Sequence, residues 1–463
     1  MNKKTYILGG GSAGLAAGWR LSKKGKAAEI IELSNRPGGL AGGVEINGNI
    51  YEYGPHLFHT TDTEILNDVK SLMGQDLMVF HRTVKVKFMG KLFDFPLSVT
   101  DVISKLPLKT VASSFFSLVF YSIRSMLVKP KVENTETVLL GNYGKILYEI
   151  FFKSYIEQVW GIPPANFSPD FARQRIPRMN FLEIMERFVK YFSRSKTEKM
   201  DTEQFVEKTE GDIFTTRRGF SMIAERIMSQ IESLGGTVRL NTSAKQLNIA
   251  DNRIESIKTS IGKIEEIVEC DHVISTLPLG VLVKLAYPAP PKEVQEAAAR
   301  LKYRATVFVG TVVRRKPVLP ASFMYYREIS FNRIMDLGYF GIDINPEDAT
   351  ILIAEVNCET SDFIWIEENH AKEMVINDLV KEGLLDKNEI LETHVFKAPH
   401  AYPIYLLNYE KDLKVLFDWV DSIKNLQTIG RQGRFQYINS HVAMKMGYNA
   451  ADAIISEQKQ TRK

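Results

Sequence analysis

The first thirty residues alternate between apolar runs, glycines and small side chains. Residues 5–9 are apolar enough for a short buried strand, and residues 13–21 have helical spacing with small side chains on the packing face. A second apolar run, residues 28–33, follows directly. This order predicts a β-α-β unit at the start of a parallel sheet.

The pattern changes several times further along the chain. Helical spacing dominates from residue 111 to about residue 191, and the polar residues 194–210 indicate a linker or a mobile loop. A helix is expected over residues 220–234, and the last helix over about residues 441–457. Strand-like runs occupy residues 83–88, 237–240, 253–260, 272–276, 306–313 and 350–356. We expect the middle runs to rejoin the N-terminal sheet and the later ones to form a mainly antiparallel sheet.

Length, composition and charge narrow the class of protein. A chain of 463 residues is too long for one ordinary domain, and 44% hydrophobic with 25% charged residues is typical of a globular protein that is soluble or peripherally bound. The net charge of +4 does not predict nucleic-acid binding. Cys270 and Cys358 have no spaced partners, which argues against a disulfide framework and a metal site and favours a cytoplasmic protein. The run Tyr6 to Leu8 is too short for the core of an export signal.

Residues 111–128 are the most apolar stretch, and lysines flank it on both sides. Arg124 and five serines lower its hydropathy below that of an ordinary membrane span. We therefore favour a buried helix or a helix of a substrate domain. A helix that dips into the inner face of the membrane, and a true span, remain alternatives.

A glycine loop follows the first strand and opens the first helix. Gly9, Gly11 and Gly14 satisfy the G-x-G-x-x-G pattern, in which glycines permit a tight turn and let backbone amides approach a pyrophosphate. Glu32, at the end of the second strand, is placed to accept hydrogen bonds from an adenosine ribose and disfavours NADP. These residues alone admit NAD as well as FAD.

The residues after Glu32 resemble a segment of FAD enzymes of the amine oxidase and glutathione reductase type, in which Gly38 and Gly39 extend contact along the diphosphate. Residues 236–242, 275–278 and 426–431, and the helix after Asn439, are similar to later parts of the same FAD site. The resemblance implies FAD as the cofactor. The cofactor-binding residues that it implies are Gly9, Gly11, Ser12, Ala13, Gly14, Glu32, Leu33, Gly38, Gly39, Leu40, His59, Val238, Gly430, Arg431, Tyr437 and Asn439.

The stretch Tyr53-Gly54-Pro55-His56-Leu57-Phe58-His59-Thr60 resembles the Y-G-A-H-x-F-H-T segment of the UDP-galactopyranose mutase family. That family's histidines lie at the flavin edge. A zinc pair is the alternative, but no cysteine or third ligand lies nearby, so we expect no metal. Residues 91–96 and 147–161 are also similar to that family, and the match places Trp160 against the nucleotide base or ribose, whereas a lone tryptophan is otherwise a core residue.

Further matches concern the substrate diphosphate. Arg175 and Arg178 resemble the R-I-P-x-R turn, although Met179 stands where the second arginine would fall. Arg333 resembles the arginine that clamps the diphosphate, a surface arginine being the alternative. The family also places two tyrosines, here Tyr402 and Tyr437, around that group, and Asn439 stands where it has aspartate.

The resemblance implies an α/β fold, α+β overall, with a discontinuous Rossmann-like FAD-binding domain (1–95, 211–280 and 396–463), a helical substrate or lid domain (96–210) and an antiparallel-sheet substrate domain (281–395). It implies a mutase that interconverts pyranose and furanose forms of a nucleotide-diphosphate sugar through an adduct at N5 of reduced flavin. The catalytic residues would be His56, His59, Arg333, Tyr402 and Tyr437, and the substrate-binding residues would be Trp160, Arg175, Arg178, Arg333, Tyr402 and Tyr437. The alternatives are an oxidoreductase of the protoporphyrinogen oxidase or desaturase type acting at a membrane, and a non-catalytic flavoprotein that serves as an assembly partner. The number of subunits is left open.

Overall fold

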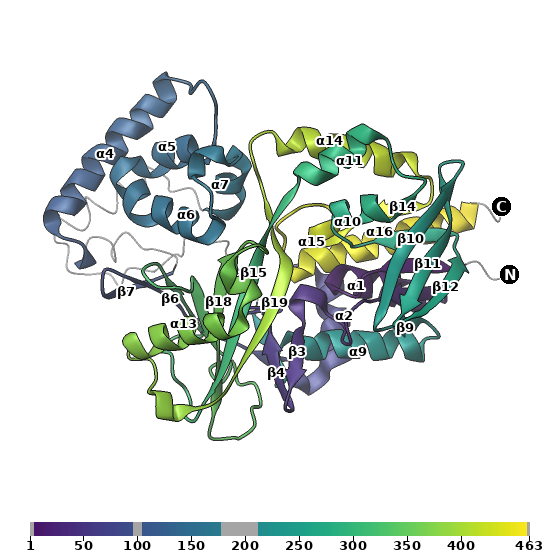
Figure 1. Cartoon of the computed structure of the whole chain (residues 1–463), viewed down its shortest axis with the longest axis horizontal. Coiled ribbons are helices and arrows are strands. Elements are labelled where there is room, and N and C mark those ends of the chain that lie inside the picture. The colour runs from purple at the N-terminus through teal and green to yellow at the C-terminus, as the bar shows by residue number, and fades with distance from the viewer. Residues whose placement is uncertain (1–3, 96–103, 177–211, 461–463) are drawn as a thin grey trace.

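A computed structural model describes residues 4–95, 104–176 and 212–460 of the chain. Its N-terminal β-α-β unit belongs to a five-stranded parallel sheet in the order β20-β13-β1-β2-β9 (Figure 1). The strands are β1 (Thr5–Leu8), β2 (Ala28–Ile31), β9 (Thr237–Arg239), β13 (His272–Ser275) and β20 (Leu426–Thr428). The expected return of later segments to the first sheet is confirmed for residues 237–240 and 272–276, because β9 pairs in parallel with β2, and β13 pairs in parallel with β1 and β20. It is wrong for residues 253–260, which pair with strands of another sheet.

Helices α1 (Ser12–Lys23), α9 (Phe220–Ser233) and α16 (Ser440–Gln460) pack around this sheet. Small residues bring the elements close together. A Cβ added at Gly447 of α16 would lie 2.3 Å from the Ala13 carbonyl oxygen, and one added at Gly18 of α1 would lie 2.8 Å from Ile30 Cδ1. The first and last helices are thereby fixed against each other.

A second sheet, in the order β12-β11-β10-β14, lies beside the parallel one. It contains β10 (Thr242–Ala250), β11 (Arg253–Ile261), β12 (Ile264–Glu269) and β14 (Ala286–Tyr287). Helices α10 (Leu279–Leu285), α11 (Lys292–Arg300) and α14 (Tyr409–Ser422) pack nearby. Leu282 and Val294 share one apolar cluster with Leu416, so residues 281–300 pack with this part of the protein rather than with the antiparallel sheet that follows.

The largest sheet has seven strands in the order β19-β15-β18-β17-β16-β6-β7, all antiparallel except for the parallel pair β16–β6. Its strands are β6 (Val84–Phe88), β7 (Lys91–Asp94), β15 (Lys302–Val313), β16 (Phe323–Tyr326), β17 (Arg333–Asp336), β18 (Thr350–Cys358) and β19 (Ile390–Ile404), and α13 (Glu368–Lys381) packs against it. A mainly antiparallel sheet was expected here. The assignment of all of residues 1–95 to the cofactor unit is corrected, because β6 pairs with β16 and thereby buries Val84 and Val86.

Residues 104–176 form a helical unit at the end of the molecule remote from both termini (Figure 1). It contains α4 (Leu108–Leu127), α5 (Thr135–Leu147), a π-helical turn (Tyr148–Lys153), α6 (Ser154–Trp160) and α7 (Pro169–Arg175). By length and composition α4 is long and apolar enough to cross a membrane. Only 22% of its apolar stretch is buried in the protein, so the expectation of a buried helix here is wrong. Arg178, Met179 and the polar segment 194–210 lie outside the described residues.

The remaining elements connect these units. They are β3 (Gly43–Ile46), β4 (Asn49–Glu52), β5 (Met78–Val79), β8 (Phe214–Thr215), α2 (Thr63–Met73), α12 (Phe363–Ile366) and α15 (Gly430–Gly433), with short 3-10 turns at Gly39–Ala41, Gly74–Asp76, Pro164–Asn166 and Lys387–Glu389.

Candidate active site

The glycine loop lies where the carboxyl end of β1 meets the start of α1. Gly9 has φ +103°, a conformation that favours glycine, and a Cβ at Gly14 would lie 2.0 Å from the Gly9 carbonyl oxygen. Gly11 is the N-cap of α1 and provides no side-chain cap, which leaves amide groups at the helix start for an anion.

The second glycine segment adjoins the first. Gly38 donates its amide hydrogen to the Gly10 carbonyl at 2.8 Å, and Gly11 and Gly38 form a β-bridge. Glu32 accepts a hydrogen bond of 2.6 Å from the Gly10 amide. The structure therefore brings the glycine loop and the Gly38-Gly39 segment together.

Gly430, at the C-terminal end of β20, closes the same edge. It has φ +78°, and a Cβ there would lie 2.9 Å from Ala13 Cβ. Arg431 is held by two hydrogen bonds to the Ile438 carbonyl, at 2.7 and 3.2 Å. Parallel α/β sheets bind dinucleotides at the carboxyl ends of their strands. This edge fits FAD because it is built from glycines, whose lack of a side chain lets a diphosphate approach the backbone amides. Leu33, by contrast, is 73% exposed, and Val238 lies within β9 at the sheet edge.

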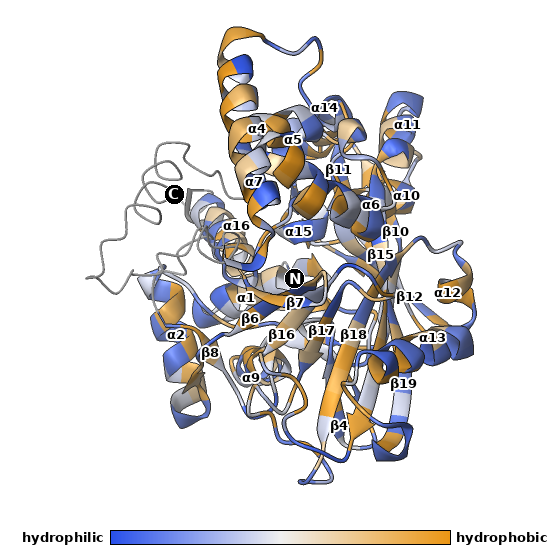
Figure 2. Ribbon diagram, turned by 90° about the vertical axis from the view of Figure 1, so that its left-hand side faces the viewer, coloured by the Kyte–Doolittle hydropathy of each residue, from blue (hydrophilic) through white to orange (hydrophobic). Residues whose placement is uncertain are grey.

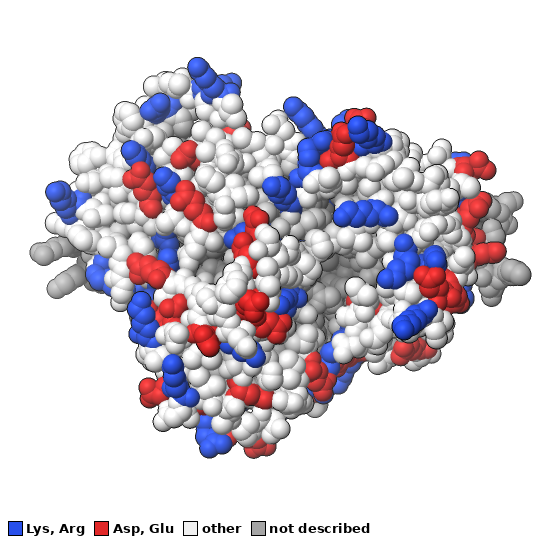
Figure 3. All heavy atoms as spheres, in the orientation of Figure 1, with Lys and Arg blue, Asp and Glu red and all other residues white. Residues whose placement is uncertain are grey.

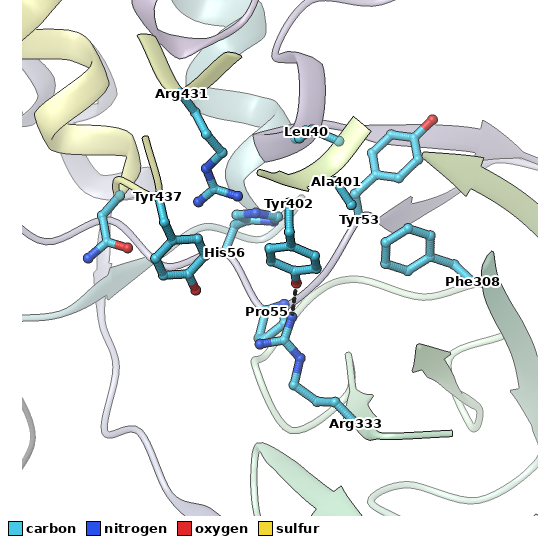
Figure 4. Close-up of a pocket in the computed structure, with 11 residues that line it drawn as sticks. Leu40, Tyr53, Pro55, His56, Phe308, Arg333, Ala401, Tyr402, Arg431 and Tyr437 are labelled. Atoms are coloured by element: carbon cyan, nitrogen blue, oxygen red, sulfur yellow. Dashed lines mark hydrogen bonds between the residues drawn. The ribbon is translucent and has the colours of Figure 1, made fainter. Parts of the chain in front are cut away.

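A small polar cavity of about 110 Å³ opens between this edge and the seven-stranded sheet (Figure 4). Most of its polar lining belongs to residues expected from the sequence. The lining residues are Leu40, Tyr53, Pro55, His56, Phe308, Arg333, Ala401, Tyr402, Arg431, Tyr437 and Asn439. Segments separated by almost four hundred residues thus meet at one cavity.

Arg333 is fixed by a buried carboxylate. Its Nε and Nη2 donate to the two oxygens of Glu355 at 2.7 and 2.8 Å, and Nη2 also donates to the Tyr402 hydroxyl at 3.2 Å (Figure 4). Burial lowers the pKa of Arg333, but Glu355, Tyr402 and Tyr325 together outweigh it and hold that pKa well above its ordinary value. The interpretation of Arg333 as an exposed surface arginine is wrong, because its side chain is only 16% exposed.

Arg175 lies in a cage of aromatic rings beside the cavity. Its guanidinium carbon is 4.0 Å from the ring centre of Tyr437 and 4.4 Å from that of Trp160. Its Nε and Nη2 are buried and have no hydrogen-bond partner among the described residues. Burial lowers the pKa of Arg175, and Tyr437 and Tyr405 oppose this. A buried cation with free donors is costly unless an anion binds there.

The two tyrosines link the arginines. The rings of Tyr402 and Tyr437 lie 6.0 Å apart, and the Tyr437 amide donates to the Tyr405 hydroxyl at 2.7 Å. The guanidinium carbon of Arg431 is 4.8 Å from the Tyr437 ring centre, so this ring contacts both Arg431 and Arg175. Hydroxyl and guanidinium donors therefore converge on one small volume.

The two histidines occupy different positions. His56 lines the cavity, and burial, together with Arg431 and Arg333, lowers its pKa to about 3. His59 does not line it but lies with its ring centre 4.5 Å from that of His441 at the start of α16. Burial, His441 and Arg82 lower the pKa of His59 to about 4. Both imidazoles are therefore neutral near pH 7.

Trp160 is a core residue that reaches the site indirectly. It is 5% exposed and packs against Phe167 and Phe171, but its ring also contacts Tyr402 at 5.7 Å and Arg175.

The sequence did not identify Glu355, or Tyr325, which pairs with Arg333 across β16 and β17. Neither has a local motif, and only the strand register brings them beside Arg333. Among the described residues no group of histidines, cysteines and acids could hold a metal ion.

Comparison with known proteins places this site in a family. A family model described as flavin containing amine oxidoreductase matches residues 12–360. The chain is 27% identical over 184 residues to a "probable UDP-galactopyranose mutase" of Klebsiella pneumoniae, covering 39% of this chain and 47% of that protein. It is 24% identical over 189 residues to dTDP-fucopyranose mutase of Escherichia coli, covering 38% and 47%.

A 1-hydroxycarotenoid 3,4-desaturase of Flavobacterium sp. (strain P99-3) is 23% identical over 283 residues, covering 58% of this chain and 56% of that protein. The chain thus spans about half the length of the curated relatives it matches. A crystal structure of reduced UDP-galactopyranose mutase has a TM-score of 0.82 at 22% identity, covering 98% of this chain and 94% of that one. Putrescine oxidase gives 0.65 at 15% identity, covering 98% and 99%. The chain belongs to the flavin-containing amine oxidoreductase family, whose members depend on FAD.

Proposed function

We propose that the protein is an FAD-dependent mutase that interconverts the pyranose and furanose forms of a nucleotide-diphosphate sugar. The observation that carries this proposal is the set of cations at the cavity. Arg333 and Arg431 line it, and Arg175 lies beside it with two buried guanidinium nitrogens that have no hydrogen-bond partner in the part of the chain that the structure describes. A diphosphate offers the acceptors that these donors lack, and guanidinium groups bind phosphate oxygens bidentately.

The side chains have separate tasks in such a reaction. Reduced FAD, when bound, supplies the electron-rich centre at which the sugar's anomeric carbon reacts. Arg333 and Arg175 bind the diphosphate and stabilise the charge that builds on it as the sugar–oxygen bond breaks. Tyr402, whose pKa is raised by burial, keeps its proton and donates a hydrogen bond. Neutral His56 adds no further charge to a site that is already cationic.

The relatives support the same substrate class. Two proteins that match parts of this chain are named as mutases of UDP-galactopyranose and dTDP-fucopyranose. The reduced form of FAD is part of the proposal, since the mutase of similar fold was crystallised reduced. A cytoplasmic location is likewise proposed, because nucleotide sugars are charged and do not cross membranes unaided.

An oxidoreductase acting on a hydrophobic molecule is the second candidate, favoured by the desaturase match over 58% of the chain. The lining of the cavity opposes it. Two arginines, a histidine and an asparagine line about 110 Å³, and a hydrocarbon would offer these polar side chains no hydrogen bond.

The decisive experiment is a turnover assay with the FAD-loaded full chain. Protein reduced anaerobically with dithionite is incubated with UDP-galactopyranose or dTDP-fucopyranose, and ring isomers are separated by anion-exchange chromatography. We expect a furanose product from reduced protein only, with no net oxidation of the flavin. Oxygen-dependent peroxide formation with a polyene or porphyrinogen, and no isomer with either nucleotide sugar, would contradict the proposal.

A further inference from the structure

We propose that α4 docks the protein on an anionic lipid surface, lying in the plane of the membrane. This inference is independent of the mutase proposal, because it rests on the outer surface of the helical unit. The helix contains 20 residues, from Leu108 to Leu127, and forms the outer edge of that unit (Figures 1 and 2).

The helix has two distinct faces. Val111, Ser114, Leu118 and Ser122 are buried against α5. The opposite face, which we call the apolar face, consists of large side chains that are exposed. They are Leu108 at 70%, Phe116 at 71%, Phe120 at 58%, Ile123 at 51% and Leu127 at 78% exposure. A contiguous row of this kind marks a site of interaction rather than an ordinary surface.

Cations border the apolar face and acids are missing from it. Lys109, Arg124, Lys129 and Lys131 are exposed, and the sequence contains no aspartate or glutamate from residue 104 to residue 132. None of the four cations forms an ion pair with a residue that the structure describes. Figure 3 shows only basic and uncharged side chains along the upper-left edge, where α4 runs in Figure 1. Each basic residue near an anionic leaflet adds about 1 kcal/mol of attraction.

The contacts between α4 and α5 favour docking over crossing. A Cβ at Gly144 of α5 would lie 2.6 Å from the Leu118 amide nitrogen, so the two backbones touch. Ser117 Oγ accepts a hydrogen bond of 2.9 Å from the Lys145 amide, and Ser122 donates to the Gly141 carbonyl at 3.1 Å. A span would break these contacts or draw the charged α5 into hydrocarbon, whereas an interfacial position keeps them.

The charge pattern also selects among partners. Two copies of the protein meeting through their apolar faces would bring eight cations together with no acid to offset them. A lipid surface bearing phosphate headgroups offers both a hydrocarbon layer for the phenylalanines and negative charge for the lysines.

The test is vesicle flotation of the FAD-loaded full chain with phosphatidylcholine vesicles, with and without phosphatidylglycerol. We expect binding only when phosphatidylglycerol is present, and loss of binding as salt rises from about 0.1 M to about 0.5 M. The double substitution Phe116→Glu with Leu127→Glu should lower binding at least roughly tenfold, and so should Lys129→Glu with Lys131→Glu.

Matched controls lie on other surfaces. Ile264→Glu with Ile267→Glu alters equally exposed apolar residues of β12, at 76% and 64% exposure, and Lys292→Glu with Lys414→Glu alters exposed lysines of α11 and α14. Both controls should bind vesicles as the unaltered chain does, and FAD content should be the same in every variant. Equal binding to neutral vesicles, unchanged binding of the α4 variants, or a dimer in solution that Phe116→Glu converts to monomer would each overturn the proposal.

Discussion

Arg333 and Glu355 occupy opposite positions on β17 and β18, and their side chains form a two-point ion pair with distances of 2.7 and 2.8 Å. Glu355 is only 1% exposed, so Arg333 is anchored on a buried carboxylate and its direction is fixed by strand register. A cation fixed in this way can bind a diphosphate without first losing the freedom of a flexible side chain.

The substitution Glu355→Gln tests that positioning role. It keeps the shape of the side chain but removes the charge that orients Arg333, so we expect kcat/KM for the nucleotide sugar to fall roughly tenfold to a hundredfold. FAD content, measured by absorbance after release, should stay the same. Glu359→Gln, at a carboxylate with 65% side-chain exposure, is the matched control and should have little effect. Equal losses in both variants would mean that Glu355 has no specific role.

Arg175→Met should stabilise the protein and weaken substrate binding at the same time. The change removes a buried cation with two donors that find no partner within residues 4–95, 104–176 and 212–460, and we expect the free energy of unfolding without nucleotide to rise by about 1–3 kcal/mol. Binding of UDP or dTDP, measured by calorimetry, should weaken at least about tenfold. Arg173→Met, on the same helix and in an exposed pair with Glu133, should change stability by less than about 1 kcal/mol. A destabilised Arg175→Met protein that binds nucleotide normally would show that Arg175 is structural.

Gly14→Ala should abolish FAD binding. The added Cβ would lie 2.0 Å from the Gly9 carbonyl oxygen, so the loop must move away from its position at the start of α1. We expect purified protein with less than about a tenth of the normal flavin content. Gly280→Ala is the control, because its Cβ would have its nearest neighbour at 3.5 Å, and the flavin content of that variant should be normal.

The contribution of His56 to the stability of the protein should decrease as the pH falls below 6.5. His56 has a pKa of about 3 in the folded chain, while an unfolded histidine titrates near 6.5. Between these values the unfolded state binds the additional proton, so lowering the pH favours unfolding. At pH 5 the loss is at most about 2 kcal/mol from this residue.

Urea unfolding at pH 7 and pH 5, with FAD in excess, measures that loss. His56→Asn should show a smaller difference between the two pH values than the unaltered chain. His370→Asn, at an exposed position on α13, should show the same difference as the unaltered chain. If His56→Asn behaves like His370→Asn, His56 does not carry the pH dependence.

The parts of the site that the sequence predicted are those with local signals. The glycine loop, Gly38-Gly39 and Gly430-Arg431 each combine a turn with a strand end, and the structure brings their backbones together. Each of these segments can be recognised on its own, because the backbone conformation that a glycine allows depends on that residue and not on distant parts of the chain.

The parts that were missed depend on pairing between distant strands. Glu355 and Tyr325 lie beside Arg333 only through the register of β16, β17 and β18, and no spacing in the sequence specifies that register. The position of β6 beside β16 has the same origin, since its alternating valines could have paired with any sheet edge. Trp160 is both a core residue and a neighbour of the site, because its buried ring contacts Tyr402 and Arg175. The sequence around an aromatic residue does not distinguish these two roles.

Positional isotope exchange tests the central claim most directly. UDP-galactopyranose or dTDP-fucopyranose is prepared with ¹⁸O in the bridge between the anomeric carbon and the β-phosphorus, and is incubated with the FAD-loaded protein. Breaking the carbon–oxygen bond frees the phosphate to rotate, so the label should spread to the non-bridging oxygens when the protein is reduced and stay in the bridge when it is oxidised. A label that remains in the bridge in both states, in protein that retains FAD and binds the nucleotide sugar, would contradict the mutase function.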